Sequence, residues 1–250
     1  MNSTYFISDL HLSSNRDDIT LCFLGLLNEI KINANHVDAL FILGDLFNYW
    51  LGDDIKEKFV LTIKKEISAL TKLNIPVYFI HGNRDFLIGN LFAKETGITI
   101  LNEQSIINLY GVDTLILHGD EMCLNDKTYQ VFRKFIRSYF IRKLSSSTPI
   151  SLKKRIASII RKFSKNHNKF KSMEIMDVSE NAVKEMFTKY NVTQMIHGHT
   201  HRPHTHVYNE NSVSRKRFVL GDWDKSGFVL KFQENGSYSI STLPFQNTCS

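Results

Sequence analysis

The sequence predicts an α/β fold in which layered β-sheet is flanked by helices. Two observations lead to this prediction. Short runs of consecutive apolar residues, bounded by glycine or proline, are typical of strands buried on both faces. Between these runs lie stretches whose apolar residues recur at helical spacing, as a βαβ arrangement requires. With 250 residues and 42% hydrophobic content, the chain is long enough to bury a full core.

The expected elements follow one another along the chain. Five apolar runs are expected to be strands, at residues 5–8, 39–43, 77–80, 115–117 and 194–196. Three closing strands are expected at 218–220, 227–232 and 238–242. Apolar stripes mark three helices, through Ile19, Phe23, Leu27 and Ile30, through Ile55, Phe59, Ile63, Ile67 and Leu70, and through Val183, Met186, Phe187 and Tyr190.

A short polar motif follows each of the first five strands. The motifs are Asp9-Leu10-His11, Gly44-Asp45, Gly82-Asn83-Arg84-Asp85, His118-Gly119-Asp120 and Gly198-His199-Thr200-His201. Because ligands of open α/β sheets bind beyond the carboxyl ends of the strands, these motifs should meet in one crevice. Carboxylate, imidazole and amide oxygen are the ligands expected for Mn²⁺, Fe²⁺ or Zn²⁺. The sequence therefore predicts a dinuclear metal centre.

Two ions need a shared ligand, and Asp45 is the predicted bridge because it stands alone in its motif between the other ligands. The remaining ligands divide into one group of Asp9, His11 and His201 and another of Asn83, His118 and His199. Two carboxylates and a bridging hydroxide leave about one positive charge on two divalent ions, which suits a phosphate or diphosphate. Taken singly, each motif has an ordinary alternative, such as Asp85 capping a following helix. The ordered combination favours the metal centre.

Basic residues are concentrated in one segment of the chain. Residues 127–173 contain fourteen Lys or Arg and no Asp or Glu, whereas the whole chain has a net charge of +6, so the remainder carries −8. Aromatic and aliphatic residues recur in the segment at helical spacing. Three serines at 145–147 interrupt this pattern, and Thr148-Pro149 begins a second helix. These features predict a helical insertion at 127–173 in a core made of 1–126 and 174–250.

Three interpretations of this basic segment are open. It could be a solvated surface, it could follow nucleic-acid phosphates with aromatic stacking, or it could lie on an anionic membrane. The absence of acidic residues argues against the first. Apolar faces with cationic flanks favour lipid over nucleic acid, so no nucleic-acid partner is expected.

Hydrophobic runs and cysteine content also indicate in which cellular compartment the protein is expected. No run approaches the roughly 18–20 apolar residues of a membrane span. The first candidate ligand is Asp9, which leaves no room for a signal peptide. Cys22, Cys123 and Cys249 are odd in number and lack ligand-like spacing, so we expect thiols in a reducing cytoplasm.

The ordered motifs resemble the calcineurin-like metallophosphoesterase superfamily. The surrounding segments are most similar to its family of lipid A biosynthesis pyrophosphatases. The similarity extends to about residue 245 and includes segments 7–12, 44–47 with Trp50 and 52–54, 82–87, 118–120 with Asp126, 129–130, 132–133, 175–178, 196–203 and 218–223.

The resemblance implies a metallophosphoesterase-type layered sandwich with a helical cap whose apolar chamber receives acyl chains. It implies two Mn²⁺ ions and hydrolysis of UDP-2,3-diacylglucosamine to UMP and 2,3-diacylglucosamine 1-phosphate. In this reaction a hydroxide held by the metals attacks the α-phosphorus. The same resemblance implies a cytoplasmic protein attached peripherally to the inner membrane. The alternatives are a nuclease or nucleotide phosphatase, or a non-catalytic scaffold that binds a membrane or a partner.

The resemblance also implies roles for individual residues. The expected catalytic residues are Asn83, Arg84, His118 and His199, with Arg84 stabilising the negative charge of the transition state. The expected substrate contacts are Asn83, Arg84, Asp126, Ser164, Asn168, Lys171 and His199. His36, His167, His204 and His206 match no ligand position, and His81 and His197 are expected to pack beside the site.

Overall fold

The structure, a computed structural model, describes residues 1–137, 177–210 and 213–245. Its strands form two mixed sheets. The first sheet has the order β11-β10-β1-β2-β3-β4, with β1 (Ser3–Ile7), β2 (Val37–Ile42), β3 (Val77–Phe79), β4 (Thr99–Ile100), β10 (Ser226–Gln233) and β11 (Tyr238–Pro244). The second has the order β5-β6-β7-β9-β8, with β5 (Gln104–Leu109), β6 (Val112–Leu117), β7 (Gln194–His197), β8 (His204–Glu210) and β9 (Val213–Val219).

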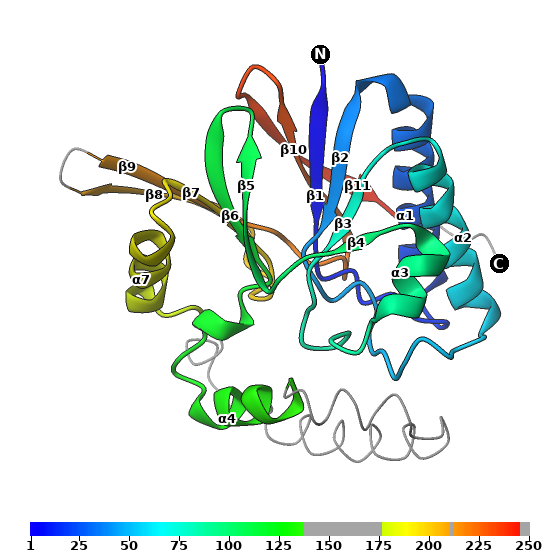
Figure 1. Cartoon of the computed structure of the whole chain (residues 1–250), viewed down its shortest axis with the longest axis horizontal. Coiled ribbons are helices and arrows are strands. Elements are labelled where there is room, and N and C mark those ends of the chain that lie inside the picture. The colour runs from blue at the N-terminus through cyan, green and yellow to red at the C-terminus, as the bar shows by residue number, and fades with distance from the viewer. Residues whose placement is uncertain (138–176, 211–212, 246–250) are drawn as a thin grey trace.

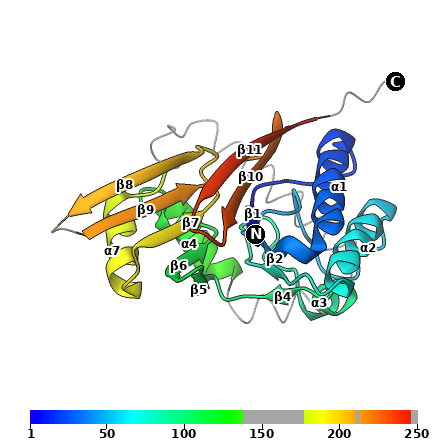
Figure 2. The same ribbon diagram turned by 90° about the horizontal axis from the view of Figure 1, so that it is seen from above.

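The two sheets face each other and helices cover their outer faces (Figures 1 and 2). On one side lie α1 (Asp17–Ile32), α2 (Lys58–Lys72) and α3 (Asn90–Thr96), and on the other lies α7 (Glu180–Tyr190). The short turns η1 (Ala34–His36) and η2 (Asp120–Met122) precede β2 and follow β6. The predicted layered sandwich with flanking helices is therefore confirmed.

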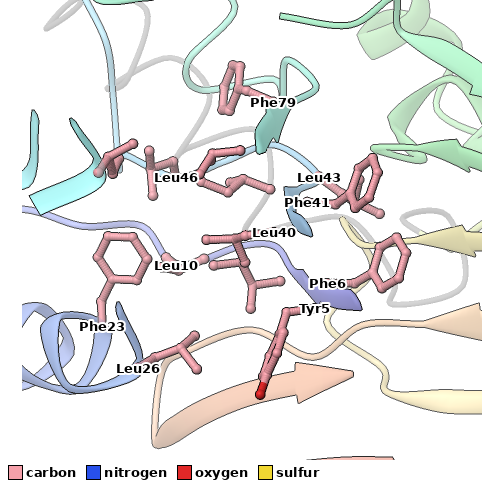
Figure 3. Packing of buried hydrophobic residues seen from close by; sticks show 14 of the residues in the cluster. Tyr5, Phe6, Leu10, Phe23, Leu26, Leu40, Phe41, Leu43, Leu46 and Phe79 are labelled. Carbon is pink, nitrogen blue, oxygen red and sulfur yellow. The ribbon is translucent and has the colours of Figure 1, made fainter. Parts of the chain in front are cut away.

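Aromatic residues fill the space between the sheets. The rings of Phe6 on β1 and Phe41 on β2 stack with centroids 5.0 Å apart, and Phe218 of the opposite sheet meets Phe232 edge-on at 5.2 Å. Figure 3 shows Phe6 and Phe41 on one side of the first sheet and Phe23 of α1 on the other. Because β1 is buried on both faces, its carboxyl end is held rigidly where the first motif begins.

Several element boundaries differ from the prediction. Helix α2 begins at Lys58, so Ile55 precedes it, although its side chain is buried. Strand β9 begins at Val213, ahead of the expected 218–220. β4, β5, β8 and α3 were not predicted. β5 and β8 are polar edge strands without a continuous apolar run, and α3 has only seven residues, too few to show a helical period.

The basic segment starts with a helix at the predicted position. Helix α4 (Lys127–Ile136) begins at Lys127, where the Asp126 carboxylate accepts a hydrogen bond from the Tyr129 amide at 3.0 Å. The rest of the segment, including the predicted second helix, lies in 138–176, outside the described residues. Among the helices that the structure describes, none is long and apolar enough to cross a membrane.

Candidate metal centre

The five polar motifs meet where the carboxyl ends of β1, β2 and β3 approach those of β6 and β7. This edge of the sandwich is the one that faces α4 in Figure 1. Backbone hydrogen bonds join the motifs in pairs. The Asp9 amide donates to the Gly44 carbonyl at 3.1 Å, and the Gly198 amide donates to the His118 carbonyl at 3.0 Å. The motifs lie together as predicted, but strands of two sheets bring them there.

The chain turns sharply at most of the predicted ligands. Five of the seven have a left-handed backbone, with φ between 51° and 69°: Asp9, His11, Asp45, His199 and His201. Non-glycine residues adopt this conformation uncommonly, and Asp and His tolerate it better than most. Such strain is characteristic of functional sites, where the surrounding structure holds it in place.

Asp85 fixes the backbone of two of the motifs. Its buried carboxylate accepts hydrogen bonds from the amides of Gly82 at 2.9 Å, Leu46 at 2.7 Å and Asp45 at 3.3 Å. The alternative in which Asp85 caps the following helix is wrong, because α3 begins only at Asn90. Asp85 therefore orients the peptides that carry Asp45 and Asn83, a role that its motif alone did not reveal.

Two glycines let the motifs approach closely. A Cβ atom at Gly82 would lie 2.0 Å from Oδ1 of Asp45, and one at Gly198 would lie 2.3 Å from Oδ2 of Asp9. Real atoms do not approach so closely, so any side chain at either position would displace a candidate ligand.

The first donor group is formed by Asp9, His11 and His201. One donor atom from each lies within 4.8 Å of the others. The Nε2 atom of His201 is 3.4 Å from Oδ1 of Asp9 and 3.4 Å from Nε2 of His11. The buried Oδ1 of Asp9 and Nδ1 of His11 have no hydrogen-bond partner among the described residues. Because such atoms are costly to bury unsatisfied, they fit a site for a cation.

The second donor group is centred on Asn83. Its Oδ1 atom lies 3.1 Å from Nε2 of His118 and 3.1 Å from Nδ1 of His199. Asp45 lies between the groups, with Oδ2 at 3.8 Å from Nδ1 of His11 and Oδ1 at 3.9 Å from Nε2 of His118. The two oxygens of this buried carboxylate thus face different groups, as a bridging ligand requires.

Burial and charge set the protonation of the imidazoles. Burial, together with the positive charge of Arg84, lowers the pKa of His11 to about 3, and burial with the charge of His118 lowers that of His199 to about 4. Both rings are therefore neutral at pH 7, the form that binds metal ions. Burial also opposes the charged form of His118, but the Asp45 and Asp9 carboxylates outweigh it and raise its pKa to about 9.

The carboxylate of Asp9 is held ionised. Burial raises its pKa, but the neighbouring imidazoles of His201 and His118 more than compensate and bring the pKa well below the usual range. An ionised, fully buried carboxylate with imidazoles beside it is a donor set that binds divalent cations.

Arg84 stands at the mouth of the site. Its Nε atom is 3.4 Å from Oδ2 of Asp45, its Nη1 donates to Asn48 at 2.8 Å, and 42% of its side chain is exposed. The guanidinium is therefore placed to meet an anion that approaches the two donor groups.

The remaining described histidines lie outside the two donor groups. His81 contacts the Ile88 carbonyl at 2.7 Å and His197 contacts Arg217 at 3.2 Å, so both pack beside the site. His204 and His206 lie on β8, and His36 is exposed in η1. Ser164, His167, Asn168 and Lys171 fall outside the described residues.

Comparison with known proteins places these residues in a wider group. The calcineurin-like phosphoesterase family matches residues 3–203. A UDP-2,3-diacylglucosamine hydrolase of Vibrio parahaemolyticus is 44% identical over 243 residues, covering 97% of this chain and 99% of that protein. Proteins of the same name are 46% identical in Photobacterium profundum, covering 94% of each chain, and 44% identical in Yersinia pseudotuberculosis, covering 97% of this chain and all of that one.

Proposed function

The chain belongs to the calcineurin-like phosphoesterases and, within them, to the UDP-2,3-diacylglucosamine hydrolase family, and on this premise we propose its reaction. It hydrolyses the diphosphate bond of UDP-2,3-diacylglucosamine, releasing UMP and 2,3-diacylglucosamine 1-phosphate for lipid A biosynthesis. The observation that carries the proposal is the pair of donor groups on either side of Asp45, in a chain that matches these relatives over nearly their whole length.

Seven side chains hold two divalent ions, for which Mn²⁺ is our proposal. Asp9, His11 and His201 bind one, Asn83, His118 and His199 bind the other, and Asp45 bridges them. The unsatisfied buried atoms of Asp9 and His11 support this assignment. When bound, the two ions supply positive charge to a diphosphate and lower the pKa of a water molecule towards neutrality.

The chain itself orients the substrate. Arg84 at the mouth and Asn83 beside it bind the phosphate, and the planar guanidinium stabilises the charge that develops at the phosphorus. Asp85 holds the backbone that leads into Asn83 and Arg84, because its carboxylate accepts a hydrogen bond from the Gly82 amide. Attack occurs at the α-phosphorus, so the oxygen from water ends in UMP and 2,3-diacylglucosamine 1-phosphate is the leaving group.

The basic segment 127–173 receives the acyl chains and binds the anionic surface of the membrane. Its fourteen cations and its apolar positions at helical spacing support this role. Within it, Ser164, Asn168 and Lys171 contact the sugar and phosphate, and Asp126 contacts the substrate from the start of α4. The protein is thus attached peripherally to the cytoplasmic side of the inner membrane.

The decisive experiment is a metal-supplemented assay run in ¹⁸O-labelled water. We expect cleavage of UDP-2,3-diacylglucosamine, with ¹⁸O appearing in UMP, and loss of activity on chelation that Mn²⁺ restores. Label in the sugar phosphate would instead place attack at the β-phosphorus. Single-stranded DNA and an aryl phosphate diester are run in parallel. Preferential cleavage of DNA would contradict the proposal and indicate a nuclease.

A second experiment tests the acyl-chain role. A flexible linker replaces residues 138–173, and α4 is retained because its side chains contact the core. We expect the aryl diester to be cleaved as before and the diacylated substrate to be cleaved poorly. Normal cleavage of the diacylated substrate by this variant would exclude the segment as the acyl-chain site.

A further inference from the structure

We propose that Arg137, at the end of α4, is a positioning residue for the Asn83 donor group. It holds the peptide that precedes Asn83 and so couples the docking of α4 to the geometry of the candidate metal centre. The proposal deepens the proposed function, on which it rests for the chemistry of the site. Three observations lead to it.

The first observation is the buried anchor to which α4 is attached. Asp120 is fully buried and lies two residues after His118. Its Oδ2 atom accepts hydrogen bonds from the Tyr129 hydroxyl at 2.6 Å, Nε of Arg133 at 2.8 Å and Nη2 of Arg137 at 3.1 Å. Three donors from one helix converge on a single carboxylate, which is a firm and specific attachment.

The second observation is that Arg137 also reaches the candidate site. Its Nη2 donates to the Gly82 carbonyl at 3.0 Å. That carbonyl belongs to the peptide that enters Asn83, whose Oδ1 lies 3.1 Å from donor atoms of both His118 and His199. The Gly82 amide, on the preceding peptide, is held by Asp85 at 2.9 Å. Arg137 and Asp85 therefore fix the two peptides on either side of Gly82.

The third observation is the placement of α4 over the second donor group. The ring of Tyr129 stacks on the His199 ring, with centroids 6.2 Å apart and planes 22° apart. The helix thus touches the Asn83 group on two sides, through a backbone carbonyl and through an imidazole. A displacement of α4 would move both contacts together.

The chemistry of the guanidinium explains why arginine is suited to this position. The Arg137 side chain is only 6% exposed. Its Nη1 pairs with Glu103 at 2.7 Å, and its Nη2 donates to Asp120 and to the Gly82 carbonyl. A planar fork reaches partners in fixed directions, whereas a lysine ammonium is a single flexible point charge. Arg137→Lys should therefore keep the charge pairing with Asp120 and lose the contact with Gly82.

Arg133 provides a matched control. It lies one turn earlier on α4 and pairs with Asp120 at 2.8 Å and Glu103 at 2.6 Å. No hydrogen bond or ion pair joins Arg133 to Gly82, Asn83 or His199 among the described residues. Arg133→Lys therefore perturbs the same anchor without touching the donor group.

The experiment compares the full-length wild-type protein with Arg137→Lys and Arg133→Lys in two measurements. The first is Co²⁺ titration followed by visible absorption, which reports the geometry and affinity of both sites without substrate. The second is kcat and KM for the aryl diester and for the diacylated substrate. Partners that orient metal ligands typically contribute about 10- to 100-fold to metal affinity or activity. For Arg137→Lys we expect a loss of that size in the affinity for the second ion and in kcat for both substrates.

Three results would overturn the proposal. One is an Arg137→Lys protein with the wild-type Co²⁺ spectrum, affinity and kcat. Another is a raised KM for the diacylated substrate alone, which would limit α4 to substrate binding. The third is an equal loss in Arg133→Lys, which would assign the effect to the docking of α4 in general. A wild-type protein that failed to cleave UDP-2,3-diacylglucosamine would refute the proposed function only, because the Co²⁺ titration needs no substrate.

Discussion

The Nε2 atom of His118 lies 3.1 Å from the Oδ1 atom of Asn83, although the two residues are 35 positions apart and follow strands of different sheets. His118 follows β6 of the five-stranded sheet, and Asn83 follows β3 of the six-stranded sheet. The candidate metal centre is therefore formed by residues from both sheets of the sandwich. Its geometry depends on how the sheets pack as well as on the motifs themselves.

Asp45→Ala should abolish turnover and reduce bound metal from two ions towards one or none. The buried carboxylate faces both donor groups, so its removal takes a candidate ligand from each. The loss should exceed the roughly 10- to 100-fold effect of removing an outer partner of a metal ligand. Elemental analysis of the purified protein measures the metal content, and Asp113→Ala on the exposed start of β6 is the control. Near-normal activity with two bound ions would exclude the assignment of Asp45.

His201→Ala and His199→Ala should affect different ions. His201 lies with Asp9 and His11, whereas His199 lies 3.1 Å from Asn83. Each variant should retain one tight metal site and lose the other in a calorimetric Mn²⁺ titration. His204→Ala, which alters an exposed histidine of β8, serves as the control. Identical titration curves for the two variants would show that the donors do not divide as proposed.

The sequence predicted which polar motifs would lie together more completely than it predicted the edge strands. Each ligand motif stands directly after an apolar run, and the carboxyl ends of neighbouring parallel strands lie at one edge of a sheet. The local sequence pattern was therefore enough to predict that Asp9, Asp45 and His118 lie close together. The Asp120 anchor was not predicted, because it joins residues that only the folded chain brings together. A signal was nevertheless present, since Arg133 and Arg137 are spaced one helical turn apart and share a face of α4.

Edge strands escaped prediction for a different reason. β8 reads His-Thr-His-Val-Tyr-Asn-Glu, and half of its side chains meet solvent, so its sequence has no apolar run to mark it. Its place in the sheet is set by seven paired positions with β9, a hairpin that depends on tertiary contact. The contacts that Asp85 does make were not predicted for a similar reason, since its partners Asp45 and Leu46 are distant in sequence.

Asp85→Asn should destabilise the protein and lower its activity. The carboxylate accepts four backbone amide hydrogen bonds, two on each oxygen, and an asparagine would present an NH₂ group to two of these donors. Leaving a buried donor unsatisfied costs about 1–3 kcal/mol, which urea unfolding can resolve. Asp113→Asn is the matched control on an exposed position. Unchanged stability and activity would show that Asp85 does not hold these turns.

Reversing charges in the basic segment should release the protein from anionic vesicles. Each basic residue near such a membrane contributes about 1 kcal/mol, so the triple change of Lys153, Lys154 and Arg161 to Glu should weaken binding by about 100-fold or more. Raising salt should release the wild-type protein as well, because the interaction fades beyond a Debye length of about 8–10 Å. Turnover of detergent-dispersed substrate should change much less, since the described donor groups lie at the strand ends.

The control for this prediction carries the same change in net charge elsewhere. Lys58, Lys65 and Lys72 are exposed on α2, on the outer face of the six-stranded sheet, and their change to Glu alters the net charge equally. Vesicle co-sedimentation at low and high salt compares the two triple variants. Release of the segment variant alone would localise membrane binding to residues 127–173. Equal release of both would mean that overall charge governs binding, and the membrane role of the segment would then be wrong.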